Sequence, residues 1–338
     1  MVEPRPFAVV SGAQVRSVLQ GNEKKVRDLV EDAYRMHGEG RTVNPPSYFL
    51  RFPDRPSSRI IALPASLGGP DGVDGLKWVS SFPSNVESGL PRASAVLILN
   101  DPNTGYPFAC FESSIISAAR TASSAALAAD VLTRDRPRPT RIGYIGTGLI
   151  ARYVHTHLVG TGWDFSSVRV HDLSSSSALG FKSCVDGEVL FGSAEEVIRS
   201  SDVVVFTTVA ASPHVHDVSW FAHNPLVLHV SLRDLSPEII LSSFNVVDDV
   251  DHCLKADTSP HLAEQQVGNR SFVHATLPQV LAGGVTVPSD QPIIFSPFGL
   301  GVLDLALARF VYDSIAASGT LQVVPDFFAE LSRYGTTR

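Results

Sequence analysis

The sequence predicts an α/β fold in two domains: a doubly wound domain with a parallel sheet, and a second domain of the α+β class. Three observations lead to this prediction. The chain has 338 residues, whereas one domain usually has roughly 150. Hydrophobic residues make up 44% and charged residues 18%, enough for a sizeable core. From about residue 140, short apolar runs alternate with helical stretches, as doubly wound domains require.

The first 120 residues favour the α+β domain. Residues 23–37 place their apolar side chains on one face of an amphipathic helix. The Pro- and Gly-rich region 41–75 and the residues up to about 111 contain strand-like runs separated by turns. Residues 114–133 then predict a helix rich in small residues, which can pack closely against a sheet.

A short polar connection at 134–140 precedes the parallel-sheet region. Nearly continuous apolar runs, typical of parallel strands buried on both faces, occur at 141–146, 167–172, 202–208 and 226–232. A long apolar helix at 299–319 is expected to return to the first domain. We therefore expect residues 121–311 to form the parallel-sheet domain, and residues 1–120 with 312–338 to form a substrate-binding and dimerisation domain.

Composition argues against several classes of protein. The 27 basic residues against 34 acidic ones, with no basic run, predict no nucleic-acid binding. No stretch approaches the roughly 18 uninterrupted apolar residues of a membrane span, and the N-terminus does not look like a signal peptide. Cys110, Cys184 and Cys253 are far apart, and the eleven histidines form no metal-binding helix face, so no metal is predicted. We expect a cytoplasmic protein.

The most specific local pattern is a glycine loop between a strand and a helix. Gly146 permits the tight turn, Gly148 lets the backbone approach a pyrophosphate, and Ala151 is small enough for close packing. The helix that follows offers its free N–H groups to phosphates. The loop residues expected to contact a dinucleotide are Gly146, Thr147, Gly148, Leu149 and Ile150. An ordinary α/β turn is the alternative interpretation.

Asp172, at the end of the next strand, indicates which dinucleotide is bound. Its carboxylate can accept hydrogen bonds from both adenosine ribose hydroxyls and would repel a 2′-phosphate, and no arginine follows it. We therefore predict a Rossmann-type domain that binds NAD in preference to NADP. Thr121 and Ser124 could donate to the pyrophosphate, and Thr207 and Thr208 end a strand near the expected nicotinamide.

Two charged residues stand out by their surroundings. Arg120 lies among Ala, Ser, Thr and Ile, so its guanidinium needs a partner, either a substrate carboxylate or an acid of the chain itself. Asp234 follows the run at 226–232, while Ser236 and Pro237 supply the N-cap and first position of a helix. Asp234 is thus expected to project from the carboxyl end of a strand, where open α/β sheets bind ligands, unless it is a turn or cap residue.

Over nearly its whole length the sequence resembles the ornithine cyclodeaminase/μ-crystallin family. The resemblance rests on LKWVSSFPSN (76–85), DPNTGYP (101–107), ARTASSAALAA (119–129), IGTGLIA (145–151) and FGLGVLDLALA (298–308). HVSLRDLSPEII (229–240) resembles the branch that makes 2,3-diaminopropionate for siderophores or peptide natural products. That branch is an NAD-dependent N-(2-amino-2-carboxyethyl)-L-glutamate dehydrogenase acting after a PLP-dependent synthase. Cyclodeaminases usually have a glycine-containing stretch where this chain has Leu232-Arg233, which favours the dehydrogenase branch.

The resemblance implies roles for several side chains. Asp234 would be the catalytic carboxylate, and Lys77 would bind the substrate near its carboxylate and nitrogen, the alternative being a strand-end lysine in solvent. Arg41, more than Arg59, would contact a second carboxylate. Arg233 would help with a third carboxylate of an amino-acid substrate, or pair with Asp248 or Glu238.

The resemblance also implies a homodimer formed through the first domain. Other members of the family stay open as alternatives: ornithine cyclodeaminase, alanine dehydrogenase, ketimine reductase, or a non-catalytic binding protein like μ-crystallin.

Overall fold

The computed structural model describes residues 4–70 and 72–331, and the chain in it forms two compact units. Unit 1 contains the residues up to Gln20, Arg41–Ser117 and the residues from Asp304 onward. Unit 2 contains Gly21–Gly40 and Ala118–Leu303. The ends of the predicted first domain, 1–3 and 332–338, lie outside the described residues, as does residue 71.

Unit 1 is built on a sheet in the order β16-β1-β7-β6-β5-β4-β2, with β3 paired to β4. Neighbouring strands are antiparallel, except β1 and β7, which are parallel. The strands are Ala8–Val10 (β1), Thr42–Val43 (β2), Tyr48–Phe52 (β3), Arg55–Leu67 (β4), Val73–Ser81 (β5), Ala93–Asn100 (β6), Pro107–Glu112 (β7) and Gln322–Val323 (β16). The helical segments are Gly12–Leu19 (α1), the 3₁₀ turn Pro83–Ser88 (η1) and most of Gly301–Ala317 (α11).

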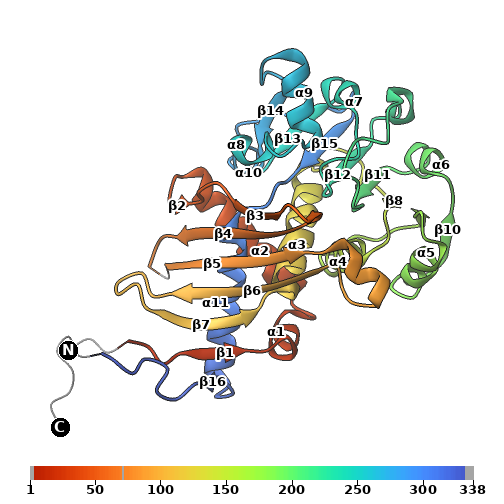
Figure 1. Cartoon of the computed structure of the whole chain (residues 1–338). Helices are drawn as coiled ribbons and strands as arrows, with labels where there is room; N and C mark the ends of the chain where they lie inside the picture. The colour runs from red at the N-terminus through yellow and green to blue at the C-terminus, as the bar shows by residue number, and fades with distance from the viewer. Residues whose placement is uncertain (1–3, 71, 332–338) are drawn as a thin grey trace, which may run out of the picture. The chain divides into compact units, whose positions relative to one another are not determined.

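Side-chain alternation gives this sheet one covered and one open face. In β5, Lys77 is buried and its neighbour Trp78 is 40% exposed, because successive side chains of a strand point to opposite faces. Figure 1 shows α11, in blue, running across one face of β4–β7. Gly75 allows this close approach: a Cβ atom there would lie 2.7 Å from Leu305 of α11.

Unit 2 contains a fully parallel sheet in the order β10-β9-β8-β11-β12-β15-β13-β14, which confirms the predicted doubly wound domain. Its strands are Arg141–Ile145 (β8), Ser167–His171 (β9), Val189–Phe191 (β10), Val203–Phe206 (β11), Leu226–His229 (β12), Phe244–Val247 (β13), Val273–Thr276 (β14) and Ile293–Ser296 (β15). The chain runs outward from β8 to β10 and then returns to β11 on the other side of β8. The order of strands therefore reverses between β8 and β11.

The helices of unit 2 include the two that the sequence predicts at 23–37 and 114–133. They are Glu23–Gly38 (α2), Ser114–Leu132 (α3, from Ala118 on), Leu149–Gly160 (α4), Ser175–Lys182 (α5), Ala194–Arg199 (α6), Val218–Phe221 (η2), Pro237–Leu241 (α7), Val250–Cys253 (α8), Ser259–Val267 (α9) and Leu277–Leu281 (α10). Although α2 precedes the strands of unit 1 in the chain, it packs against α4 and α10 of unit 2.

Helix α3 is long and apolar enough to cross a membrane by length and composition alone. In the structure, however, 72% of its most apolar window is buried inside the protein. Helix α3 is thus a helix of the protein core, and its buried alanines allow the close packing that the sequence predicts.

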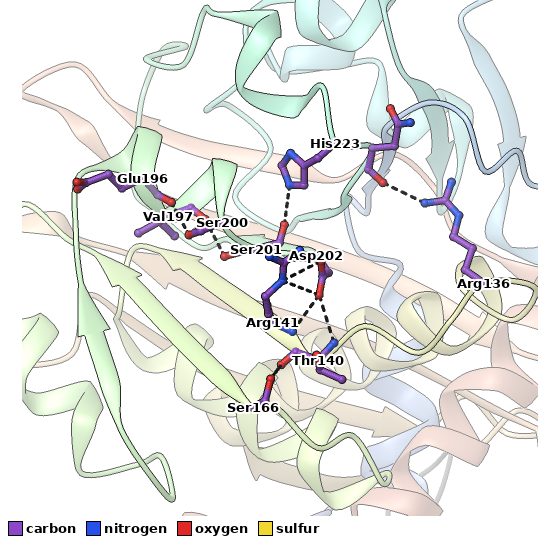
Figure 2. A network of polar contacts seen from close by, with 11 residues as sticks. Arg136, Thr140, Arg141, Ser166, Glu196, Val197, Ser200, Ser201, Asp202 and His223 are labelled. Atoms are coloured by element: carbon purple, nitrogen blue, oxygen red, sulfur yellow. Dashed lines mark hydrogen bonds and ion pairs between the residues drawn. The ribbon is translucent and has the colours of Figure 1, made fainter.

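The polar connection at 134–140 is anchored at the amino-end edge of the parallel sheet (Figure 2). Asp202 accepts hydrogen bonds from the side chain of Arg141 and from the backbone N–H groups of Thr140 and Arg141. Arg136 donates to the carbonyl of Asn224 at 3.1 Å. These contacts fix where β8 begins, and therefore where the glycine loop at its other end lies.

Candidate active site

The glycine loop follows β8 and has the shape of a phosphate cradle. Gly146 has a φ of +87°, and a Cβ atom there would lie 3.0 Å from the backbone of Thr207 and Thr208, so only glycine fits. Gly148 is the N-cap of α4 and makes no side-chain capping bond. A Cβ atom at Gly148 would meet nothing within 4 Å, which leaves open space before the helix N-terminus. Both features suit a bound pyrophosphate.

This loop lies at the point where the strand order reverses. The hydroxyl of Thr207, just after β11, donates to the carbonyl oxygen of Gly146 at 2.7 Å and so joins the carboxyl ends of β8 and β11. Open α/β sheets bind their ligands at this crevice. Thr208 follows Thr207 and reaches Asp234, as described below.

Asp172 lies at the end of β9 beside the glycine loop. Its Oδ2 accepts hydrogen bonds from the backbone N–H of Thr147 at 2.7 Å and from its hydroxyl at 2.8 Å, while Oδ1 accepts from the N–H of Ser174 at 2.8 Å. Each carboxylate oxygen can accept about two hydrogen bonds. The carboxylate therefore shapes the loop and retains capacity for a ribose hydroxyl, which stays a prediction.

The two predicted cofactor contacts in α3 differ in their surroundings. Thr121 is partly exposed. Ser124 is only 1% exposed, accepts a hydrogen bond from the hydroxyl of Tyr34 at 3.1 Å and donates to the carbonyl of Arg120 at 2.9 Å. These contacts disfavour Ser124 as a cofactor ligand. Its role is internal packing of α2 against α3.

Asp234, which is itself buried, is the centre of a polar cluster at the carboxyl ends of β11 and β12. Its Oδ1 lies 3.0 Å from Nε2 of His214 and accepts from the hydroxyl of Thr208. Its Oδ2 lies 3.2 Å from Nε2 of His229 and accepts from the hydroxyl of Ser231. We call these five residues the Asp234 cluster. The sequence predicts the position of Asp234 but not its contacts with His214 and His229.

Asp234 is fully buried but stays ionised. Burial alone would raise its pKa, but the hydrogen bonds from His214, His229 and Ser231 outweigh burial and hold the pKa far below the ordinary range. Such a carboxylate is a strong hydrogen-bond acceptor and a poor acceptor of protons at neutral pH.

The turn before Asp234 is strained at one residue. Leu232 has a φ of +71°, a left-handed conformation that bulky side chains rarely adopt and that costs on the order of 1–3 kcal/mol. Its side chain packs on Val247 and Cys253, and its carbonyl accepts from the N–H of Ser259 at 2.7 Å. The turn thus has the backbone shape that glycine favours, although the residue is leucine.

The residues after Asp234 act partly as predicted. Ser236 is the N-cap of α7 and Pro237 its first residue, but the side chain of Ser236 makes no capping hydrogen bond. The carboxylate of Asp234 is committed to its cluster, so the cap and turn interpretations of this residue are both unsupported by its contacts.

Arg233 contacts the backbone of a neighbouring loop. Its Nε and Nη2 donate to the carbonyl oxygen of Ala256 at 3.2 and 2.7 Å. Asp248 accepts from the N–H groups of Phe298 and Gly299, and Glu238 accepts from the side chain of Gln266. Arg233 therefore ties the strained turn to the loop that precedes α9.

Arg120 is 9% exposed and packs on the backbone after β15. A Cβ atom at Gly299 would lie 2.4 Å from its Nη1, and Gly299 has a φ of +98°. Glycine is thus required at 299 both by the backbone and by the guanidinium. This places Arg120 at the carboxyl-end edge of the same sheet.

Lys77, in unit 1, is not a solvent-exposed strand-end lysine. It is 2% exposed, and its Nζ donates to Asp304 at 2.7 Å and to the hydroxyl of Ser117 at 3.1 Å. Asp304, in the first turn of α11, is fully buried and is a partner that the sequence does not reveal. Arg41 lies between α2 and β2 and is exposed, and Arg59 lies in β4 and is partly exposed.

Among residues 4–70 and 72–331 no group of three or more His, Cys, Asp and Glu side chains is arranged to hold a metal ion.

Known proteins resemble this chain over most of its length. An alanine dehydrogenase of Archaeoglobus fulgidus is 30% identical, with 90% of this chain and 94% of the relative covered. The N-((2S)-2-amino-2-carboxyethyl)-L-glutamate dehydrogenase of Staphylococcus aureus is also 30% identical, with 86% and 90% covered. The solved structure of an archaeal alanine dehydrogenase dimer with bound NAD is 28% identical, has a TM-score of 0.84 and covers 95% of this chain and 99% of its own.

The sequence pattern of one protein family also matches this chain. The match covers residues 9–319, which include the glycine loop, Lys77, Arg120 and the Asp234 cluster. The chain belongs to the ornithine cyclodeaminase/mu-crystallin family.

Proposed function

We propose that this chain is an NAD-dependent dehydrogenase that acts on the CH–NH bond of N-(2-amino-2-carboxyethyl)-L-glutamate. The products are 2-oxoglutarate and L-2,3-diaminopropionate. The observation that carries the proposal is the carboxyl-end edge of the parallel sheet in unit 2. There an open glycine loop and an ionised buried carboxylate lie at the ends of neighbouring strands.

The residues of this edge suit NAD. The N-terminus of α4 and the loop from Gly146 to Ile150 would hold the pyrophosphate, and Asp172 the adenosine ribose. When bound, NAD⁺ supplies the acceptor for a hydride from the carbon next to the nitrogen. The archaeal alanine dehydrogenase, which shares the fold, contains NAD, in agreement with this assignment.

The substrate is a secondary amine that loses a hydride from its α-carbon and a proton from its nitrogen, which leaves a C=N bond. Water then adds to that bond, and its cleavage gives a ketone and a primary amine. The protein must bind the amine in its neutral form and accept the released proton. The Asp234 cluster is the part of the chain suited to the proton transfers, and Lys77 is assigned to the substrate near its carboxylate and nitrogen.

Positive charge supports this substrate over simpler amino acids. The proposed substrate has three carboxylates, whereas alanine and ornithine have one each. Burying a carboxylate without a cationic partner is costly. We assign Arg120 to one carboxylate, Arg41 or Arg59 to a second, and Arg233 to the third. The turn at Leu232–Asp234, which differs from the glycine-containing stretch of cyclodeaminases, holds Arg233 in place.

Alanine dehydrogenase is the second candidate, because the relative from Archaeoglobus fulgidus is as similar as the staphylococcal enzyme. The same glycine loop, Lys77 and Asp234 would serve either reaction. Under the favoured proposal the protein is a cytoplasmic homodimer. It consumes the product of a PLP-dependent synthase and supplies 2,3-diaminopropionate for a siderophore or peptide natural product.

A substrate panel tests the proposal. Purified protein is mixed with NAD⁺ and, separately, N-(2-amino-2-carboxyethyl)-L-glutamate, L-alanine, L-ornithine or L-proline, and NADH absorbance is followed. We expect turnover of the tricarboxylate, with 2-oxoglutarate and 2,3-diaminopropionate identified by mass spectrometry. Oxidation of alanine alone would replace the favoured function by the second candidate. NAD binding without turnover of any amino acid would instead indicate a non-catalytic binding protein.

A further inference from the structure

We propose that His214 is the catalytic group that exchanges the proton with the substrate nitrogen, and that Asp234 is a positioning residue for it. The inference deepens the proposed function and rests on it. It changes the assignment made from the sequence, in which Asp234 itself carries the proton.

The segment that carries His214 is fixed against Asp234 by backbone and side chain together. The N–H groups of His214 and Val215 both donate to the carbonyl oxygen of Asp234 at 3.0 Å, and Val215 and Leu235 form a parallel β-bridge. Nε2 of His214 then lies 3.0 Å from Oδ1 of Asp234. These three contacts hold the imidazole of His214 beside the carboxylate of Asp234.

The other members of the cluster are less suited to carry a proton. His229 is fully buried, and its Nδ1 lies 3.3 Å from the hydroxyl of Ser296. The hydroxyls of Thr208 and Ser231 do not titrate near neutral pH. The side chain of His214 is 39% exposed, whereas Asp234 and His229 are fully buried. Within the cluster, His214 is therefore the imidazole that solvent can reach.

Asp234 decides which ring nitrogen of His214 is basic. Because hydrogen bonds hold the pKa of Asp234 far below the ordinary range, its carboxylate stays ionised and only accepts. Nε2 of His214 must therefore carry the hydrogen, which leaves Nδ1 with the lone pair. A buried carboxylate that orients a histidine in this way also stabilises the imidazolium once it forms.

His214 can serve each proton transfer of the reaction in turn. As the C=N bond forms, Nδ1 of His214 takes the proton of the amine nitrogen, and the imidazolium releases it to solvent. Water next adds its oxygen to the carbon and, through His214, one proton to the nitrogen. The C–N bond breaks as the hydroxyl proton leaves and the carbonyl forms, and His214 delivers that proton to the departing amine. The oxidant is the NAD⁺ of the proposed function.

Kinetics of matched variants test the role. His214→Ala is expected to lower kcat by about 10²–10⁴-fold, the usual contribution of a positioned acid–base group, without changing NADH affinity measured by fluorescence. Added imidazole should restore part of the activity. His216→Ala, on an exposed residue of the same loop, is the control and should stay within a few-fold of wild type. Activity of His214→Ala within a few-fold, or a loss that imidazole does not restore, would overturn the proposal.

A second measurement does not depend on activity. In protein with ¹⁵N-labelled histidine and no substrate, the nitrogen shifts of His214 should report hydrogen on Nε2 and a lone pair on Nδ1. The opposite tautomer would contradict the proposal. If the substrate panel identifies a different amino acid, the variants are compared on that amino acid, so the proposed function can fail while the role of His214 stands.

Discussion

Asp172 combines two tasks at the scale of a single residue. Its carboxylate accepts two hydrogen bonds from Thr147 and one from Ser174, so it shapes the glycine loop. Its negative charge lies at the end of β9, where the adenosine ribose is expected. Shaping the loop requires oxygen atoms that accept hydrogen bonds, whereas discrimination at the ribose requires the negative charge. A substitution that keeps an oxygen and removes the charge therefore separates the two roles.

We therefore expect Asp172→Asn to weaken the choice between cofactors. Wild type should prefer NAD⁺ over NADP⁺ at least tenfold in kcat/KM, about 1.4 kcal/mol, because the carboxylate repels the 2′-phosphate. Asp172→Asn should bring the ratio close to one, measured from NADH and NADPH absorbance. Thr147→Val removes one of the loop bonds but keeps the charge, so it should retain the preference. An unchanged ratio in Asp172→Asn would show that the selectivity lies elsewhere.

Single residues also show what the sequence could and could not predict. The glycine loop and Asp234 were predictable because both are marked locally, by a strand before them and a helix after them. Two partners of Asp234, His229 and Ser231, lie within five residues of it, whereas His214 comes from a loop after a different strand and only the fold brings it near. Likewise the leucine at position 232 gives no sign of its left-handed conformation, although the glycine-containing stretch of cyclodeaminases at this place agrees with it.

At the scale of elements, α4 contains two buried histidines. His155 and His157 are 5% and 4% exposed. Burial lowers the pKa of each to about 4, outweighing weak attraction from Asp186 and Glu23. In an unfolded chain a histidine has a pKa of about 6.5. Between these values the unfolded chain binds more protons than the folded one, so acid favours unfolding.

Stability should therefore be complete above about pH 6.5 and fall as the pH falls toward 4. Each histidine contributes a slope of about 1.4 kcal/mol per pH unit in this window. Urea unfolding at pH 7, 6 and 5 measures this slope, and His157→Leu should make it shallower than in the wild type. His216→Leu, at an exposed position, is the control and should leave it unchanged. Equal slopes in wild type and His157→Leu would refute this account of α4.

The contact between β5 and α11 in unit 1 could not be predicted from the sequence either, because its residues are far apart in the chain. Lys77 in β5 and Asp304 in α11 are separated by 227 residues and meet only because α11 returns to the sheet. Periodicity predicts each element, and the apolar character of α11 predicts its return. Neither of these two signals identifies the ion pair between Lys77 and Asp304. Both side chains are buried, so removing one charge would leave the other buried without a partner.

At the scale of the whole molecule, the sheet of unit 1 has an exposed apolar row across four strands. Tyr48, Ala62, Trp78 and Val96 are aligned in register on β3, β4, β5 and β6. Tyr48 is 66%, Trp78 40% and Val96 43% exposed. Contiguous apolar surface of this kind marks interaction sites. In the homodimer of the proposed function, a second copy of this chain would cover this row.

Sedimentation velocity at micromolar concentration should therefore show a homodimer, and Trp78→Glu should convert it to a folded monomer. The charge would lie in the centre of the row, where an unpaired carboxylate cannot be buried without a large cost. Leu179→Glu is the matched control, since Leu179 is 62% exposed but lies on α5 of unit 2. It should leave the dimer intact, and circular dichroism should show that both variants are folded. A monomeric wild type, or a Trp78→Glu variant that remains a dimer, would contradict the assignment of this face. In that case the apolar row would need a different occupant.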